Sequence, residues 1–279
     1  MERGSKTLYQ RGGSAVSNSA VSNLMSGNEC VLAQIRTKGI ARVGVFKSPP
    51  FMDWEIIDQN LVPSGLYGEL LQLLCSKYSI NLELVPTNLS DSVSSVERGD
   101  VDFMACILQT LERSKRVDFT AFFHSMAVGG VTLKSNKQIK TSQDLQNGDW
   151  TIVVCEGEVG HEYAETILRI PKWRLVIVDT LDISDMVAYL ISGRAHVALA
   201  DSISCKRFLD QCAQSKPPLK SLFRRHPLML CPNGFMVKKN QKRLANWLDK
   251  ELHSLRNDPK IREIEDDVLE EYAGLITRL

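Results

Sequence analysis

The hydrophobic positions of the chain follow a repeated alternation of strand and helix patterns. Residues 40–46, 81–86 and 101–107 are short apolar runs with β-branched side chains, which predict strands. Between them, residues 65–79 and 89–98 carry apolar side chains at helical spacing. This β-α-β-α-β order with short connections predicts a parallel sheet that is covered by helices on both faces.

The same alternation returns in the second part of the chain. Strands are predicted over residues 150–154, 175–178 and 195–200, with helices over residues 161–168 and 183–191 between them. An extended segment and two further helices follow, at residues 228–237, 242–255 and 261–272. The fold class predicted from this order is α/β, with two successive sheets flanked by helices.

Two extended crossings connect these two parts of the chain. They lie near residues 129–135 and 230–238, and we expect them to act as a two-strand hinge between two lobes. Lobe 1 is predicted to contain residues 31–131 and 236–279, and lobe 2 residues 132–235. Before lobe 1, residues 1–30 are rich in Ser, Gly and Asn, and we expect a disordered tail there.

A charged residue follows a central strand of each lobe. Thr110 is a good N-cap for a short turn that carries Arg113 just after the strand at 101–107, and Asp201 directly follows the strand at 195–200. Ligands bind to open α/β sheets at the carboxyl ends of strands, and the planar guanidinium of arginine matches a carboxylate. If the lobes face each other, Arg113 and Asp201 would hold the two ends of a zwitterion. The alternative for Arg113 is a solvated surface charge, which is the commoner role of arginine.

Composition and charge exclude some partners. The 279 residues suffice for two domains, and 34 basic against 33 acidic residues give a net charge of +1, which gives no support for nucleic acid as a partner. No apolar run is long enough for a transmembrane helix, so the chain is not expected to span a membrane. Seven cysteines lack CxxC spacing and the histidines lack metal-ligand spacing, so we expect free thiols, no metal and no cofactor.

Several segments occur with the residues and in the order that one family shows. They are residues 35–45, 49–51, 96–102, 110–113, 117–119, 142–145, 192–201 and 234–237. Together they resemble extracellular solute-binding proteins of family 3, which are type II periplasmic binding proteins for amino acids. The resemblance covers about residues 31 to 274.

The resemblance implies two lobes that close over a small amino-acid-like ligand. It places Arg113 at the carboxylate-binding position and Asp201 where the family binds the amino group. It also implies a monomer that serves an ABC permease, and a periplasmic location. No secretory signal is visible in residues 1–30, however, and together with the seven cysteines this leaves a cytoplasmic location open.

Other positions of the expected site depart from the family pattern. Cys106 and Leu108 stand where the family usually offers hydrogen-bond donors. Gly157 is followed by Glu158 and Val159, where the family tends to have Thr or Ser after the glycine. A carboxylate beside a ligand carboxylate is repulsive unless one of them is neutralised. Three outcomes follow: a ligand with an additional cationic part, an outward-facing Glu158 with an ordinary amino-acid site, or loss of ligand binding.

Two aromatic residues complete the set of predicted ligand-binding positions. Phe51 follows the Pro-Pro pair, and Trp54 lies in the next loop, where it either lines the mouth of the cleft or covers the core.

The predicted function is solute capture for ABC-type uptake or sensing, without catalytic residues. The runner-up is an enzyme like the cyclohexadienyl or arogenate dehydratases, which share this fold, with Glu158 as the candidate acid. The third possibility is a sensory or interaction module that has lost ligand binding.

Overall fold

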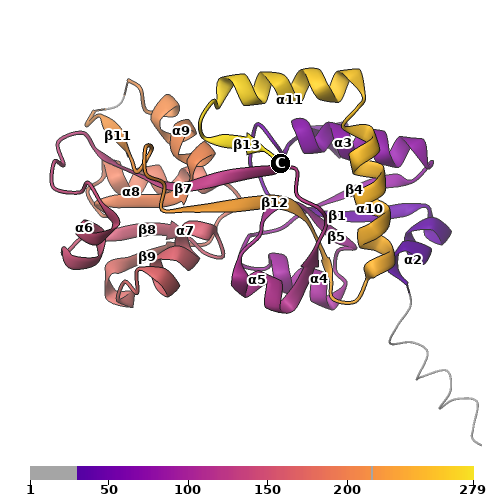
Figure 1. Ribbon diagram of the computed structural model, residues 1–279, viewed down its shortest axis with the longest axis horizontal. Helices are drawn as coiled ribbons and strands as arrows, with labels where there is room; N and C mark the ends of the chain where they lie inside the picture. Colours follow the sequence, from indigo (N-terminus) through magenta and orange to yellow (C-terminus); the bar gives the residue numbers. More distant parts are fainter. Residues whose placement is uncertain (1–29, 215) are drawn as a thin grey trace, which may run out of the picture.

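The computed structural model describes residues 30–214 and 216–279 as a mixed α/β protein with two lobes (Figure 1). All but the last residue of the predicted tail at 1–30 lies outside the described residues. The first lobe, on the right in Figure 1, begins with the predicted alternation. Its elements are α2 (Val31–Lys38), β1 (Ile40–Val45), β2 (Asp53–Ile57), β3 (Asn60–Ser64), α3 (Leu66–Lys77), β4 (Asn81–Pro86), α4 (Ser92–Arg98), β5 (Phe103–Leu108), α5 (Leu111–Arg116) and β6 (Val117–Phe119).

The second lobe repeats this alternation with shorter and less regular helices. Its elements are α6 (Ser142–Asn147), β8 (Ile152–Cys155), α7 (Val159–Glu162), the π-helix η1 (Tyr163–Ile167), the 3-10 helix η2 (Lys172–Arg174), β9 (Leu175–Val178), the 3-10 helix η3 (Ile183–Met186), α8 (Val187–Ile191), β10 (Val197–Asp201), α9 (Ser202–Gln211) and β11 (Leu219–Leu222). The chain then returns to the first lobe and ends with α10 (Lys242–Leu255), α11 (Pro259–Glu271) and β13 (Ile276–Arg278).

Two ten-residue strands, β7 (His124–Leu133) and β12 (Met229–Lys238), run across the molecule and join the lobes (Figure 1). They pair with each other in antiparallel orientation, from Met229 opposite Val128 to Asn233 opposite His124. One sheet therefore continues through both lobes in the order β4-β1-β5-β12-β7-β10-β8-β9. Within each lobe the neighbouring strands β1, β4 and β5, and likewise β8, β9 and β10, are parallel, as the succession of strands and helices predicted.

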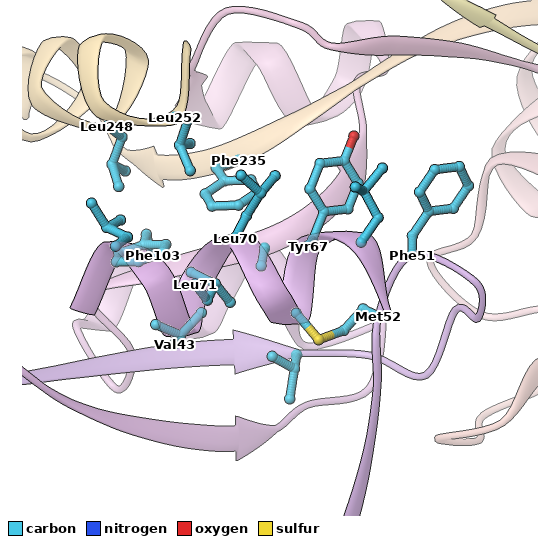
Figure 2. Packing of buried hydrophobic residues seen from close by; sticks show 14 of the residues in the cluster. Val43, Phe51, Met52, Tyr67, Leu70, Leu71, Phe103, Phe235, Leu248 and Leu252 are labelled. Atoms are coloured by element: carbon cyan, nitrogen blue, oxygen red, sulfur yellow. The ribbon is translucent and has the colours of Figure 1, made fainter. Parts of the chain in front are cut away.

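The core of the first lobe forms around α3. Its apolar residues recur at helical spacing and bury one face, with Tyr67, Leu70, Leu71 and Leu74 almost inaccessible to solvent. Figure 2 shows α3 with strands below it and Leu248 and Leu252 of α10 above it, and the labelled Tyr67, Leu70 and Leu71 lie in the same cluster as Phe235 of β12. Burial of each such side chain stabilises the fold by roughly 1.5–3 kcal/mol, so this cluster fixes the sheet on which the first lobe carries its part of the site.

A second apolar cluster contains residues of both lobes. Phe46, Leu89 and Ile107 of the first lobe belong to the same contiguous cluster as Val153 and Ile183 of the second. The lobes are therefore in contact in this structure, and polar contacts join them as well. The side chains of Asn88 and Ser90 both donate to Asp179 Oδ1, each at 2.9 Å.

The main differences from the predicted elements are in the second lobe and at the C-terminal end. Residues 161–168, predicted as one helix, form the end of α7 and the π-helix η1, and the predicted helix at 183–191 begins as the 3-10 helix η3. Among the elements that were not predicted are α9, β11 and β13. The first turn of α9, Ser-Ile-Ser-Cys, has modest helix propensity, and this turn is stabilised by the Asp201 cap, while Phe208 is buried further along the helix.

Candidate functional site

Arg113 is positioned by the turn that follows strand β5. Thr110 caps α5, because its hydroxyl oxygen accepts a hydrogen bond from the Arg113 backbone N–H at 3.2 Å. The guanidinium is buried, with 7% of the residue exposed, and it donates to the carbonyl of Leu108 and, across the lobe boundary, to that of Gly157. Burial lowers the pKa of the guanidinium, although the nearby charge of Glu158 opposes this. The alternative considered for Arg113, a solvated surface charge, is therefore wrong.

Asp201 ends strand β10 and caps helix α9. Its Oδ1 accepts from the backbone N–H groups of Ile203 (2.9 Å) and Ser204 (3.0 Å), and Oδ2 accepts from the Ser204 hydroxyl at 2.6 Å. Burial raises the pKa of the Asp201 carboxyl, against the lowering effect of these hydrogen bonds. Three donors thus hold the carboxylate in a fixed orientation at the carboxyl end of the sheet.

Glu158 lies beside Asp201, at the start of helix α7. Its side chain turns back onto its own helix, where Oε2 accepts from the Gly160 backbone N–H, and Oε1 accepts from the Asp201 backbone N–H at 3.1 Å. Burial, and after it the charge of Asp201, raise the pKa of the Glu158 carboxyl to about 8. Only 4% of the residue is exposed, so the possibility that Glu158 points outward is wrong.

One cavity between the lobes brings the three charged residues together. Its volume is about 40 Å³, which holds roughly three water molecules. Arg113 lines it from the first lobe, and Glu158 and Asp201 line it from the second. The remaining lining side chains are mostly apolar: Phe46, Ser48, Leu89, Cys106, Ile107, Leu108, Val159, Ile183 and Ser204.

Cys106 occupies an unusual place in this lining. It has a positive φ of 58°, and its Sγ accepts a hydrogen bond from the Asn233 side chain at 3.4 Å. Burial raises the pKa of the thiol to about 12, so the sulfur is uncharged at neutral pH. Cys106 therefore adds a weakly polar surface and no charge to the cavity.

The predicted site residues separate into two groups. Cys106, Leu108, Val159 and the three charged residues line the cavity. Gly157 does not line the cavity, but its carbonyl accepts a hydrogen bond from Arg113, and its φ of 75° and close approach to Leu89 and Ser90 leave no space for a side chain. A Cβ at this position would lie 2.6 Å from backbone atoms of those two residues.

Phe51 and Trp54 do not line the cavity. Phe51 is fully buried in the core of the first lobe and stacks on Tyr67 with ring centroids 5.5 Å apart (Figure 2). Trp54 covers the same core, and Lys47 Nζ lies 5.0 Å from the centroid of its ring. Of the two roles left open for Trp54, the structure shows core packing, because the β2-β3 hairpin turns its ring inward.

Phe46, Ile107 and Ile183 line the cavity without having been predicted. Phe46 lies just after β1, before Lys47, and Ile107 lies near the end of β5, after Cys106. The sequence marks both residues only as apolar positions, which does not distinguish the cavity lining from the core. Ile183 reaches the cavity from η3, and its side chain belongs to the apolar cluster that contains residues of both lobes. In the described ranges, no group of three or more His, Cys, Asp or Glu residues could hold a metal ion. Nor does the described part of the chain contain a helix with the length and apolar content needed to cross a bilayer.

Comparisons with known proteins agree with this architecture. Residues 42–271 match the family model of the bacterial extracellular solute-binding proteins, family 3. The solute receptor for L-cysteine of Neisseria gonorrhoeae is similar in structure, with a TM-score of 0.69 and 26% identity over 88% of this chain and 96% of that chain. No curated protein matches the sequence.

Two further solved structures have the same fold. The cysteine-binding protein from Campylobacter jejuni has a TM-score of 0.71 at 20% identity, and the alignment covers 88% of this chain and 94% of that chain. An ancestral amino acid-binding protein, described as a precursor of cyclohexadienyl dehydratase, has a TM-score of 0.68 at 22% identity and covers 86% of this chain and 99% of that chain. The fold is accordingly that of the type II periplasmic binding proteins.

Proposed function

The chain belongs to the bacterial extracellular solute-binding proteins of family 3, and on this premise we propose that it captures a small amino-acid-like molecule between its lobes. The proposed lobes are residues 31–131 with 236–279 and residues 132–235. In this proposal β7 and β12 form the hinge, and the cavity at the lobe boundary is the binding site. Its small volume in the present structure means that the lobes part to admit a ligand.

The observation that supports this proposal is a set of three buried ionisable side chains without ion-pair partners. None of Arg113, Glu158 and Asp201 lies within 4.0 Å of an oppositely charged side chain among the described residues. Buried charges are expensive to maintain unless something pairs with them. A bound molecule with an anionic and a cationic end would supply both partners.

We assign the ligand carboxylate to Arg113 and the ligand ammonium group to Asp201. The guanidinium uses only two of its N–H groups on the carbonyls of Leu108 and Gly157, which leaves donors for a carboxylate. Asp201 presents an oriented carboxylate on the opposite side of the same cavity. The apolar side chains of Leu108 and Val159, together with Cys106, would contact the ligand's own side chain.

Similar proteins support this class of ligand. The two receptors described above bind cysteine according to their descriptions, and arginine-bound relatives share the fold. By the same reasoning we propose an ABC permease as the partner of a monomeric receptor. The alternative partner is a signalling module, because a histidine kinase sensor domain with similarity to periplasmic binding proteins has the same fold, with a TM-score of 0.68.

The direct test is to identify the molecule that the protein retains. Purified protein is denatured and the released small molecules are analysed by mass spectrometry, and amino acids are screened in parallel for an increase in the melting temperature. We expect an amino-acid-like zwitterion that raises the melting temperature and binds with a stoichiometry of one. Absence of binding by every amino acid tested would contradict the proposal.

One observation favours a second candidate function. Glu158 retains its proton near neutral pH inside the cavity, as a general acid must. A dehydratase acting on prephenate or arogenate would use such an acid, and the ancestral neighbour is described as a precursor of cyclohexadienyl dehydratase. Incubation of the protein with each compound distinguishes the two functions: formation of an aromatic product supports the enzyme, and unchanged substrate removes it.

A further inference from the structure

The charges in the cavity do not balance those of a simple zwitterion. Arg113 supplies one positive charge, whereas Glu158 and Asp201 supply two carboxyl groups. A ligand with one carboxylate and one ammonium group would satisfy Arg113 and Asp201. One carboxyl group would then remain beside the ligand carboxylate, where an ionised form would repel it.

The hydrogen bonds distinguish the two carboxyl groups. Asp201 accepts from three donors, one of them a hydroxyl, and this arrangement favours its ionised form. Glu158 accepts from two backbone N–H groups and from no hydroxyl, and its Oε1 accepts from Asp201 N at 3.1 Å. An oxygen that carries a proton can still accept such a bond. Glu158 is therefore the group that holds a proton near neutral pH, in agreement with its raised pKa of about 8.

We propose that Glu158, in its protonated form, donates a hydrogen bond to the ligand carboxylate held by Arg113, and that the site thereby selects small zwitterions with one carboxylate and one ammonium group. This inference rests on the proposed function. The carboxylic acid would replace the hydroxyl and amide donors that Cys106 and Leu108 do not offer. The two backbone N–H groups at Gly160 and Asp201 are occupied by Glu158 itself, so they do not compete for this role.

The rest of the lining argues against a second cation on the ligand. Phe46, Leu89, Ile107 and Ile183 surround the charged groups with apolar surface, which offers no polar partner to a second cation. The titratable and charged groups that act on Glu158 from the elements packed around it are Asp201, Arg113, Cys155, Cys205 and Cys231. Burial raises the pKa of all three thiols, so they stay uncharged. Burial is also the main cause of the raised pKa of Glu158, and of the neighbouring charges Asp201 raises it further and Arg113 lowers it.

The test compares the parent protein with Glu158→Gln, which keeps the shape of the protonated side chain and cannot ionise. The matched control is Glu156→Gln, which removes an exposed carboxylate from the same turn. Binding of glycine, L-alanine and L-serine is measured by calorimetry from about pH 6 to about pH 9, and the melting temperature of each ligand-free protein is measured over about pH 5 to 8. The ligand ammonium group titrates in the same way with every protein. The ratio of the parent's affinity to that of Glu158→Gln at each pH therefore reports on Glu158.

We expect the affinity of the parent and of the Glu156→Gln control to fall about tenfold between about pH 7 and about pH 9, after division by the affinity of Glu158→Gln at the same pH. An affinity ratio that does not change with pH would overturn the proposal, and so would parent affinity that rises with pH, because that result indicates a second cation on an ionised Glu158. If no amino acid binds any of the proteins, the proposed function fails. The ligand-free series still decides the state of Glu158, because a melting-temperature difference between parent and Glu158→Gln that is constant with pH would by itself overturn the proton assignment.

Discussion

Arg113 of the first lobe donates a hydrogen bond to the backbone carbonyl of Gly157 in the second, 44 residues along the chain. The residue assigned to the ligand carboxylate therefore also joins the two lobes. Closure and ligand binding would then depend on the same guanidinium. This link makes Arg113 the first position to test.

Replacement of Arg113 by alanine should abolish most of the affinity for the ligand. Loss of one partner of a desolvated charge pair typically costs about 2–5 kcal/mol of binding free energy. Calorimetry with the ligand found by thermal-shift screening measures this loss. Arg116→Ala is the matched control, because Arg116 lies on the same helix, is exposed and pairs with Glu97. Equal affinities in Arg113→Ala and the control would contradict the assignment.

Replacement of Gly157 by alanine should hold the lobes apart. The new Cβ would meet the backbone of Leu89 and Ser90 at 2.6 Å, in the opposite lobe, and backbone cannot move aside as a flexible side chain can. We expect a larger radius of gyration by small-angle X-ray scattering and weaker ligand binding. Gly193→Ala controls for backbone strain, because Gly193 has a similar φ of 71° with no neighbour within 4 Å of the added carbon. An identical radius in the two variants would show that this contact does not limit closure.

Stability of the ligand-free protein should fall as pH rises, because of Glu158. Its pKa of about 8 in the folded chain exceeds the ordinary value of about 4.3 for an unfolded chain. Between these values the folded protein holds a proton that the unfolded chain has released, so the stabilisation is complete below about pH 4.3 and is lost as pH rises through about 8. The contribution of Glu158 to the slope is about 1.4 kcal/mol per pH unit, and Glu158→Gln removes this contribution, while that of Asp201, whose pKa is also raised by burial, remains. Denaturant unfolding of both proteins across this range measures the difference.

Glu265 should give the opposite dependence. Burial acts to raise the pKa of its carboxyl, but the hydrogen bond with His124 and the charge of Arg256 outweigh burial and lower the pKa to about 2. Its contribution to stability is present above about pH 4.3 and lost as pH falls through about 2. Glu265→Gln should therefore destabilise the protein by roughly 2–5 kcal/mol at neutral pH and progressively less in acid. Glu263→Gln, an exposed change on the same helix, should have little effect at any pH.

The sequence predicted the order of strands and helices well because that order depends on apolar periodicity, which local residues determine. The charged residues at strand ends were also predictable, since the carboxyl ends of parallel strands meet at one edge of a sheet. Arg113 follows β5 of the first lobe and Asp201 ends β10 of the second, and they line one cavity because the two lobes meet there. The family resemblance then supplied the expectation of two lobes, which the family match and the fold confirm.

Other features depend on contacts that no local pattern reveals. The orientation of Glu158 follows from its side chain turning back to cap α7 and from the nearby backbone of Asp201, which belongs to another strand. The inward turn of Phe51 and Trp54 follows from the packing of the β2-β3 hairpin on the core. Helix α9 was missed because the Ser and Cys residues of its first turn have modest helix propensity and its cap, Asp201, was interpreted only as a binding residue.

The two roles of Asp201 limit its value for recognising which related proteins still bind a ligand. The same carboxylate that faces the cavity also secures the first turn of α9 through three hydrogen bonds. A related protein that no longer binds a ligand would still lose folding stability if this aspartate were replaced, so natural selection would retain it. Arg113 donates to two backbone carbonyls but caps no helix, and burial of its charge is unfavourable without a bound anion, so it is the more informative marker of a receptor that still binds its ligand.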